Sequence, residues 1–199
     1  MKNKQNLIKN NYLSSKTNHA ICIGITDLGQ KGELFVGIHI AALLVIMHCY
    51  KKEPLNVEDI IQTLEMTIKH RAFLPNIKRI HSDRGSIFKN LPYQSFIEEK
   101  KIEISRGSAK GHTNQVMERT FRSLKDLIRD QMDAHWREKR KGDIKDKTKK
   151  EINAYDPINK KSFNYQQMKD FVDNALNTYN NRPHGSLGKM SPFHMHGKR

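Results

Sequence analysis

Cysteine and long apolar runs are scarce in this sequence of 199 residues. Cys22 and Cys49 are its only cysteines and form no CxxC pair, which gives no sign of a disulfide framework and favours a reducing cytoplasm. The most hydrophobic segment, residues 34–47, is shorter than the roughly 20 residues that a membrane span needs. Residues 1–16 hold no apolar stretch typical of a signal peptide. We therefore expect no contact with a membrane.

Several catalytic motifs are missing as well. The sequence holds no GxxxxGK[ST] loop for ATP, no HExxH among its ten histidines, and no recognisable Ser, Tyr or Cys nucleophile motif. Acidic residues are few beside basic ones, since 36 Lys and Arg against 21 Asp and Glu give a net charge of +15. This excess favours a polyanionic partner such as DNA, because neutralised phosphates release counterions. The alternative is a soluble protein from an organism whose proteins are rich in Lys and Asn.

The apolar pattern predicts a single α/β domain. Short β-branched and apolar runs predict strands over residues 21–27, 34–40, 43–50, 77–81 and 101–105. Helical spacing predicts helices that begin at residue 56 or 57, at 91, at 114 and at 163, and end near 68, 100, 132 and 181. Asn56 is the expected N-cap of the first helix, with Asp59 in the capping-box position. We expect a five-stranded mixed sheet flanked by helices.

The composition changes in two places along the chain. Residues 1–18 are polar and predict a flexible N-terminal arm, which leaves residues 19–196 as the core. Within the core, residues 137–161 are rich in Lys and Arg and almost without apolar side chains. This composition indicates an exposed basic insertion that is flexible or partly helical.

Three carboxylates are placed where stiff elements could bring them together. Asp83 ends the fourth predicted strand, Glu118 lies on the amphipathic helix 35 positions later, and Asp27 ends the first strand. If the first and fourth strands are neighbours, Asp27 and Asp83 lie side by side and Glu118 approaches from the helix over the sheet. Three such carboxylates can hold two divalent ions. Each acid also has an ordinary interpretation, as a turn residue, a solvated helical acid and a strand end.

The surroundings of these acids form extended motifs. They read His81-Ser82-Asp83-x-Gly85-Ser86, then Asn114-x-x-Met117-Glu118-x-x-Phe121-x-x-Leu124-Lys125, and YNNRPHGSLG at residues 179–188. With these motifs the chain, from about Asn18 to His194, resembles the catalytic core of insertion-sequence transposases of the retroviral-integrase type, the DDE superfamily.

The resemblance implies an RNase H-like fold in which Asp27, Asp83 and Glu118 bind two Mg²⁺ or Mn²⁺ ions and are the catalytic residues. It implies hydrolysis at a transposon end, followed by attack of the freed 3′-hydroxyl on target DNA. Its partners would be transposon ends and target DNA, bound by a homo-oligomer. A bacterial, cytoplasmic and nucleoid-associated location follows from the same resemblance.

The sequence departs from the pattern of this superfamily at several positions. The Trp usual before the first acid is missing, the gap between Asp83 and Glu118 is one residue shorter than the common one, and His39 stands where an Asp is frequent. These departures favour an alternative, an inactive or domesticated remnant that binds DNA without catalysis. A third possibility is a metal nuclease of the same fold that never joins strands.

Three further residues are candidates for contact with DNA. Arg122 and Lys125 lie on the helix of Glu118, where they could contact phosphates or form an ordinary solvated face. Asn114 lies one turn before Glu118, so it could touch DNA, orient the acid or cap the helix. His81 is expected to fix the strand end or the Asp83 loop, with a metal-ligand role as the less favoured interpretation.

Overall fold

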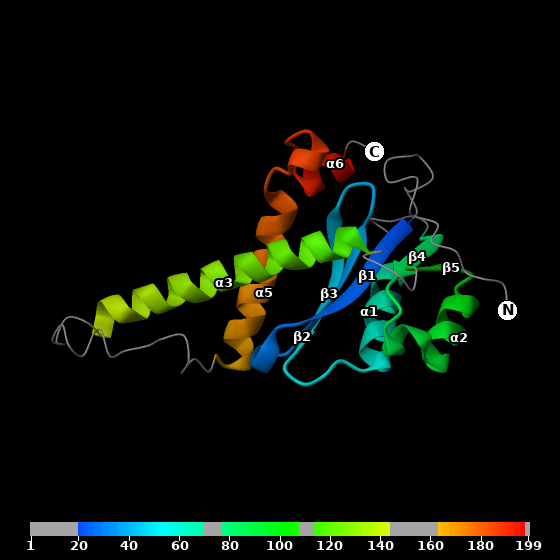
Figure 1. Cartoon of the computed structure of the whole chain (residues 1–199), viewed down its shortest axis with the longest axis horizontal. Helices are drawn as coiled ribbons and strands as arrows, with labels where there is room; N and C mark the ends of the chain where they lie inside the picture. Colours follow the sequence, from blue (N-terminus) through cyan, green and yellow to red (C-terminus); the bar gives the residue numbers. More distant parts are fainter. Residues whose placement is uncertain (1–19, 70–76, 108–113, 144–162, 198–199) are drawn as a thin grey trace.

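A computed structural model describes residues 20–69, 77–107, 114–143 and 163–197. Its centre is a five-stranded mixed sheet with the order β3-β2-β1-β4-β5 (Figure 1). The strands are β1 (Ala20–Asp27), β2 (Glu33–His39), β3 (Leu44–Lys51), β4 (Arg79–Ser82) and β5 (Glu103–Arg106). β1 pairs antiparallel with β2 and parallel with β4. The predicted five-stranded mixed sheet is thus confirmed, and the first and fourth strands are neighbours, as the site hypothesis required.

Five α-helices surround the sheet in the described part of the chain. They are α1 (Val57–Lys69), α2 (Leu91–Glu99), α3 (Gln115–Asp143), α5 (Tyr165–Asn181) and α6 (Pro192–Gly197). Figure 1 shows α3 crossing α5 and continuing past the sheet. None of these helices has the length and apolar character needed to cross a lipid bilayer.

The helix α3 is longer than the sequence predicted. It continues beyond residue 132 to Asp143, so the first part of the predicted basic insertion is helical. Aromatic contacts support the extension, because the ring of His135 lies 5.7 Å from that of Phe171 in α5 and the ring of Trp136 lies 5.8 Å from that of Phe163, two residues before α5. Residues 144–161 of the predicted insertion and the predicted arm, residues 1–18, lie outside the described residues.

The sheet has a separate apolar core on each face. Alternate residues of a strand point to opposite faces, and in β1 Ala20 and Cys22 join the core beneath α3 and α5. Ile21 and Ile23 join the core beneath α1 and α2. The sheet is therefore covered on both faces, which explains why its central strands read as continuous apolar runs.

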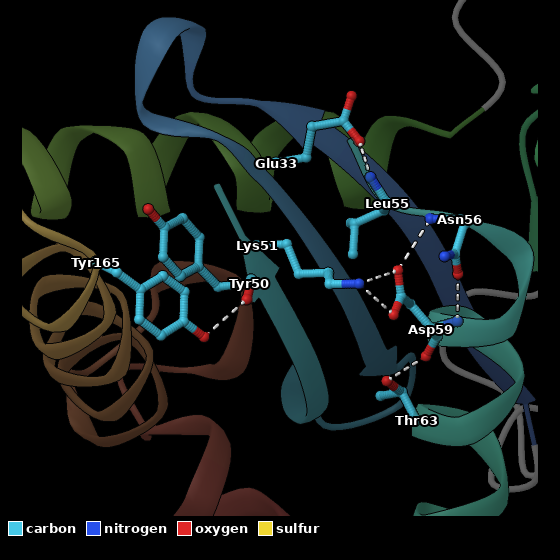
Figure 2. Close-up of polar contacts among 8 residues, drawn as sticks. All are labelled: Glu33, Tyr50, Lys51, Leu55, Asn56, Asp59, Thr63 and Tyr165. Atoms are coloured by element: carbon cyan, nitrogen blue, oxygen red, sulfur yellow. Dashed lines mark hydrogen bonds and ion pairs between the residues drawn. The ribbon is translucent and has the colours of Figure 1, made fainter. Parts of the chain in front are cut away.

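The start of α1 is fixed by reciprocal hydrogen bonds. The Asp59 backbone N–H donates to Asn56 Oδ1 at 2.9 Å, and the Asn56 N–H donates to Asp59 Oδ2 at 3.0 Å. Lys51 Nζ of β3 donates to Asp59 Oδ1 at 2.8 Å (Figure 2). The predicted capping box is therefore present, and its acid also connects the helix to the sheet.

Candidate metal and DNA site

Asp83 lies in the turn that directly follows β4. Its side chain is exposed, and its Oδ1 accepts a hydrogen bond from the Gly85 N–H at 2.8 Å. The preceding strand end is held from within, since buried His81 contacts Ser105 Oγ of β5 through its Nδ1 at 2.9 Å. His81 therefore fixes the end of β4 as the sequence led us to expect, and the turn presents the Asp83 carboxylate at the surface.

Glu118 lies in the first turn of α3 and is also exposed. Its N–H donates to the backbone carbonyl of Asn114, the residue before the helix, at 3.0 Å. Asn114 is buried, and its Oδ1 accepts a hydrogen bond from Cys22 Sγ of β1 at 3.0 Å. The beginning of α3 is thus joined to the central strand of the sheet.

Cys22 of β1 lies near Asp83 and contacts the residue that precedes the helix of Glu118. Burial raises the pKa of its thiol, and the nearby negative charge of Asp83 raises it further. Cys22 is therefore neutral, close to the charge of Asp83, and bonded to the residue one turn before Glu118. Cys22 pairs with His81 and packs in the core beneath α3, and Asp83 follows His81 by two residues. Alternation therefore places Asp83 at the end of β4 on the face covered by α3, the helix of Glu118.

Asp27, the third predicted acid, lies at the end of β1, where the hairpin to β2 begins. Its Oδ1 accepts a hydrogen bond from the Gly29 N–H at 2.6 Å, inside the turn that joins β1 to β2. Its partner across the hairpin is Glu33, whose Oε2 accepts from the Leu55 N–H at 2.8 Å (Figure 2). Since Leu55 belongs to the core beneath α1, and directly paired residues share a face of the sheet, Asp27 is placed on the face opposite to α3.

The placement of Asp27 affects whether the three predicted carboxylates can bind two metal ions together. Within the described ranges, no three His, Cys, Asp or Glu side chains gather in a group that could hold a metal. Asp83 and Glu118 offer carboxylate oxygens of the kind that Mg²⁺ and Mn²⁺ prefer. The set of three carboxylates, with Asp27 as its third member, does not fit a shared metal centre here.

The candidate DNA contacts differ in their exposure. Arg122 is exposed and Lys125 half-buried on α3, together with exposed Arg119. Asn114 is buried and bonded to Cys22, so its side chain is engaged in the structure at the helix start rather than displayed on the surface. Further along, Arg129 forms an ion pair with Asp126 at 3.0 Å.

A cavity of about 360 Å³ lies beside the first turns of α3. Its lining includes the apolar residues Ile40, Val116 and Leu187. Its polar side chains include Gln115, Arg119 and His184. Burial lowers the pKa of His184, whose Nε2 lies 3.0 Å from the Tyr179 carbonyl. Sequence reasoning did not identify this cavity, although the YNNRPHGSLG motif supplies part of its wall.

Solved structures share this architecture. A chain in the structure of the simian T-cell lymphotropic virus intasome, determined with the PP2A regulatory subunit B56 gamma, matches 96% of this chain with a TM-score of 0.65 and 18% identity. The present chain spans 58% of the length of that chain. The catalytic core domain of BIV integrase matches 91% of this chain, and 95% of its own length is covered, with a TM-score of 0.58 and 17% identity.

The HTLV-2 integrase catalytic core domain, determined in complex with magnesium, gives a similar result. It matches 90% of this chain over 96% of its own length, with a TM-score of 0.59 and 17% identity. No protein-family model matches the sequence, and no curated protein matches it significantly. At these identities the likeness concerns the fold. The chain therefore has the RNase H-like fold of the retroviral integrase catalytic core.

Proposed function

We propose that this chain binds DNA as a transposase- or integrase-type core, in the class of proteins that carry out DNA recombination and integration. The observation that carries the proposal is the integrase core fold over nearly the whole chain, with Asp83 and Glu118 on the side of its sheet covered by α3. The net charge of +15 supports a polyanionic partner, and the intasome that contains a similar fold supports assembly of several copies on DNA.

The full reaction of this class is a second candidate function. It comprises metal-dependent cleavage of a DNA end and transfer of that end to target DNA, with Mg²⁺ or Mn²⁺ bound by Asp27, Asp83 and Glu118. The exposed positions of Asp83 and Glu118 favour it. A magnesium-bound structure of similar fold supports the choice of metal.

The placement of Asp27 favours DNA binding without cleavage. This acid is used in the β1–β2 turn, and its partner across the hairpin is bonded on the α1 side of the sheet. We therefore propose that the chain binds DNA without cutting it, as a remnant or a domesticated form of a transposase would. Asp83 and Glu118 remain the proposed acidic pair of the site.

Two measurements on the same preparations separate the candidates. Fluorescence anisotropy of a labelled duplex, in buffer with EDTA, should show binding that weakens steeply as salt rises. Incubation of supercoiled plasmid with Mn²⁺ should yield no nicked product above the background of Asp83→Asn and Glu118→Gln. Nicking by the wild type that both substitutions abolish would establish the catalytic candidate, and absence of salt-sensitive binding would contradict the proposal itself.

A further inference from the structure

We infer that Gly24 occupies the place where a third carboxylate would complete the centre formed by Asp83 and Glu118, so that this chain holds at most one divalent cation there, and weakly. The inference rests on the proposed function and deepens it, because it gives a chemical reason why DNA binding is not followed by cleavage.

The register between β1 and β4 places Gly24 beside Asp83. The two strands are parallel, and their pairs run Ala20 with Arg79, then Ile21 with Ile80, then Cys22 with His81. Counting two residues further along both strands brings Gly24 level with Asp83. Asp27 is three residues beyond that level, which corresponds to roughly 10 Å along an extended strand.

Position 24 also points toward the helix that carries Glu118. A Cβ atom built on Gly24 would lie 3.3 Å from Met117 Cε and 3.1 Å from Phe121 Cε2. Both residues belong to α3, and Met117 directly precedes Glu118. A side chain at position 24 would therefore extend between the Asp83 turn and the first turns of α3. In the wild type the apolar side chains of Met117 and Phe121 cover the glycine instead.

Asp27 cannot replace the missing group without leaving its present contacts. Residues 21, 23 and 25 of β1 contact the core beneath α1, and Asp27 shares their alternation. Its Oδ1 accepts the Gly29 N–H, which fixes the hairpin turn. To reach α3 the carboxylate would have to cross from one face of the sheet to the other, with a loss of the turn hydrogen bond.

The consequence for metal binding follows from charge. A pair of carboxylates offsets a single divalent ion, whereas two ions held close together repel each other and require further anionic ligands. Cys22, which pairs with the strand of Asp83, and Asn114, one turn before Glu118, add a thiol and an amide that are bonded to each other, and neither adds a carboxylate. The centre therefore lacks the negative charge that a pair of metal ions needs.

Substitution at Gly24 tests the inference with a matched steric control. Gly24→Asp adds a carboxylate, and Gly24→Ala adds only the Cβ atom that presses on Phe121. Mn²⁺ affinity, measured by isothermal titration calorimetry in the absence of DNA, should rise by about tenfold or more in Gly24→Asp relative to Gly24→Ala. The rise should disappear when Asp83→Asn is added. Circular dichroism verifies that each variant is folded.

Asp27→Asn in the wild-type background gives an independent answer if Gly24→Asp does not fold. The amide oxygen of the introduced asparagine can still accept the Gly29 N–H. Asp27→Asn should therefore leave the weak Mn²⁺ binding unchanged, whereas Asp83→Asn should reduce that binding. Mn²⁺ binding too weak to detect in the wild type agrees with the inference as well. A loss of Mn²⁺ affinity in Asp27→Asn equal to that in Asp83→Asn would overturn it, as would a folded Gly24→Asp that binds no better than Gly24→Ala. DNA binding in EDTA reports on the proposed function separately.

Discussion

The two faces of the central sheet use acidic residues differently. On the α1 face, Glu33 and Asp59 each accept hydrogen bonds from backbone N–H groups, and Asp59 also pairs with Lys51 (Figure 2). On the α3 side, Asp83 and Glu118 lie exposed at a turn and at a helix start. Glu33 and Asp59 are half-buried and bond to groups of neighbouring segments, so they stabilise the fold. Asp83 and Glu118 are exposed, and Asp83 accepts its hydrogen bond from the Gly85 N–H of its own turn. The burial and the partners of an acid therefore indicate its role better than its place at a strand end does.

The largest effects on stability are expected from substitutions in the two apolar cores. One buried leucine in each core allows the two to be compared. Leu64 of α1 and Leu124 of α3 are both fully buried, one on each face. Leu64→Ala and Leu124→Ala should each lower the free energy of unfolding by about 2–5 kcal/mol, because each leaves a cavity in a packed core. Urea unfolding followed by circular dichroism measures both losses.

The same pair separates stability from function. Leu124→Ala should also weaken DNA binding, measured by anisotropy below the unfolding transition, because α3 carries Glu118 and the proposed phosphate contacts Arg122 and Lys125. Leu64→Ala should leave the affinity of the folded protein for DNA unchanged. Equal weakening of DNA binding by both substitutions would remove the functional difference between the two faces.

A smaller effect is expected from Asp59→Ala, which removes the capping box of α1 and the Lys51 contact. The free energy of unfolding should fall by about 1–2 kcal/mol near neutral pH. Burial alone would raise the pKa of Asp59, but the hydrogen bonds from the Asn56 N–H and Lys51 outweigh it and hold the pKa below its ordinary value. The carboxylate therefore stabilises the fold above the ordinary carboxyl pKa, and this contribution is lost as the pH falls through the lowered value.

Unfolding measured from neutral pH into the acid range tests this sign. The difference in stability between wild type and Asp59→Ala should shrink as the carboxyl group becomes protonated. Glu58→Ala is the control, since Glu58 is an exposed acid in the same helical turn. Its effect should stay within about 0.5 kcal/mol. A difference for Asp59→Ala that persists unchanged in acid would show that charge plays no part in the cap.

Most of the fold could be predicted from the sequence because it depends on local patterns. Apolar runs and helical spacing indicated the five strands and the main helices, whereas the adjacency of the first and fourth strands was only a condition of the site hypothesis. The end of α3 was missed, since it depends on contacts of His135 and Trp136 with aromatic rings that come later in the chain. Such contacts leave no periodic signal.

The site was harder to predict because it depends on register. Asp83 and Glu118 were identified by the motifs around them, whereas Asp27 was chosen as the acid at the end of the first strand. Which residue of β1 lies level with Asp83 is set by the pairing of Cys22 with His81, and that pairing cannot be read from either segment alone. If the register of β1 against β4 shifts by an odd number of residues, each side chain of β1 also moves to the opposite face of the sheet.

The smallest effects on stability, and the sharpest test of the α3 face, are expected from its basic residues. Arg122→Ala and Lys125→Ala should change the free energy of unfolding by no more than about 0.5 kcal/mol. Each should weaken DNA binding several-fold and reduce the slope of log affinity against log salt by about one, because each phosphate contact releases roughly one counterion.

Arg129→Ala provides the control on the same helix. The Arg129 guanidinium is paired with Asp126, so part of its charge is already offset and less remains for a phosphate. Its substitution should therefore alter the salt slope less than either Arg122→Ala or Lys125→Ala. Equal slopes for all three variants would mean that α3 contributes only a diffuse positive field, and DNA would then have no defined position over Asp83 and Glu118. Unequal slopes would place the phosphates on the turns nearest Glu118, over the centre that Gly24 leaves incomplete.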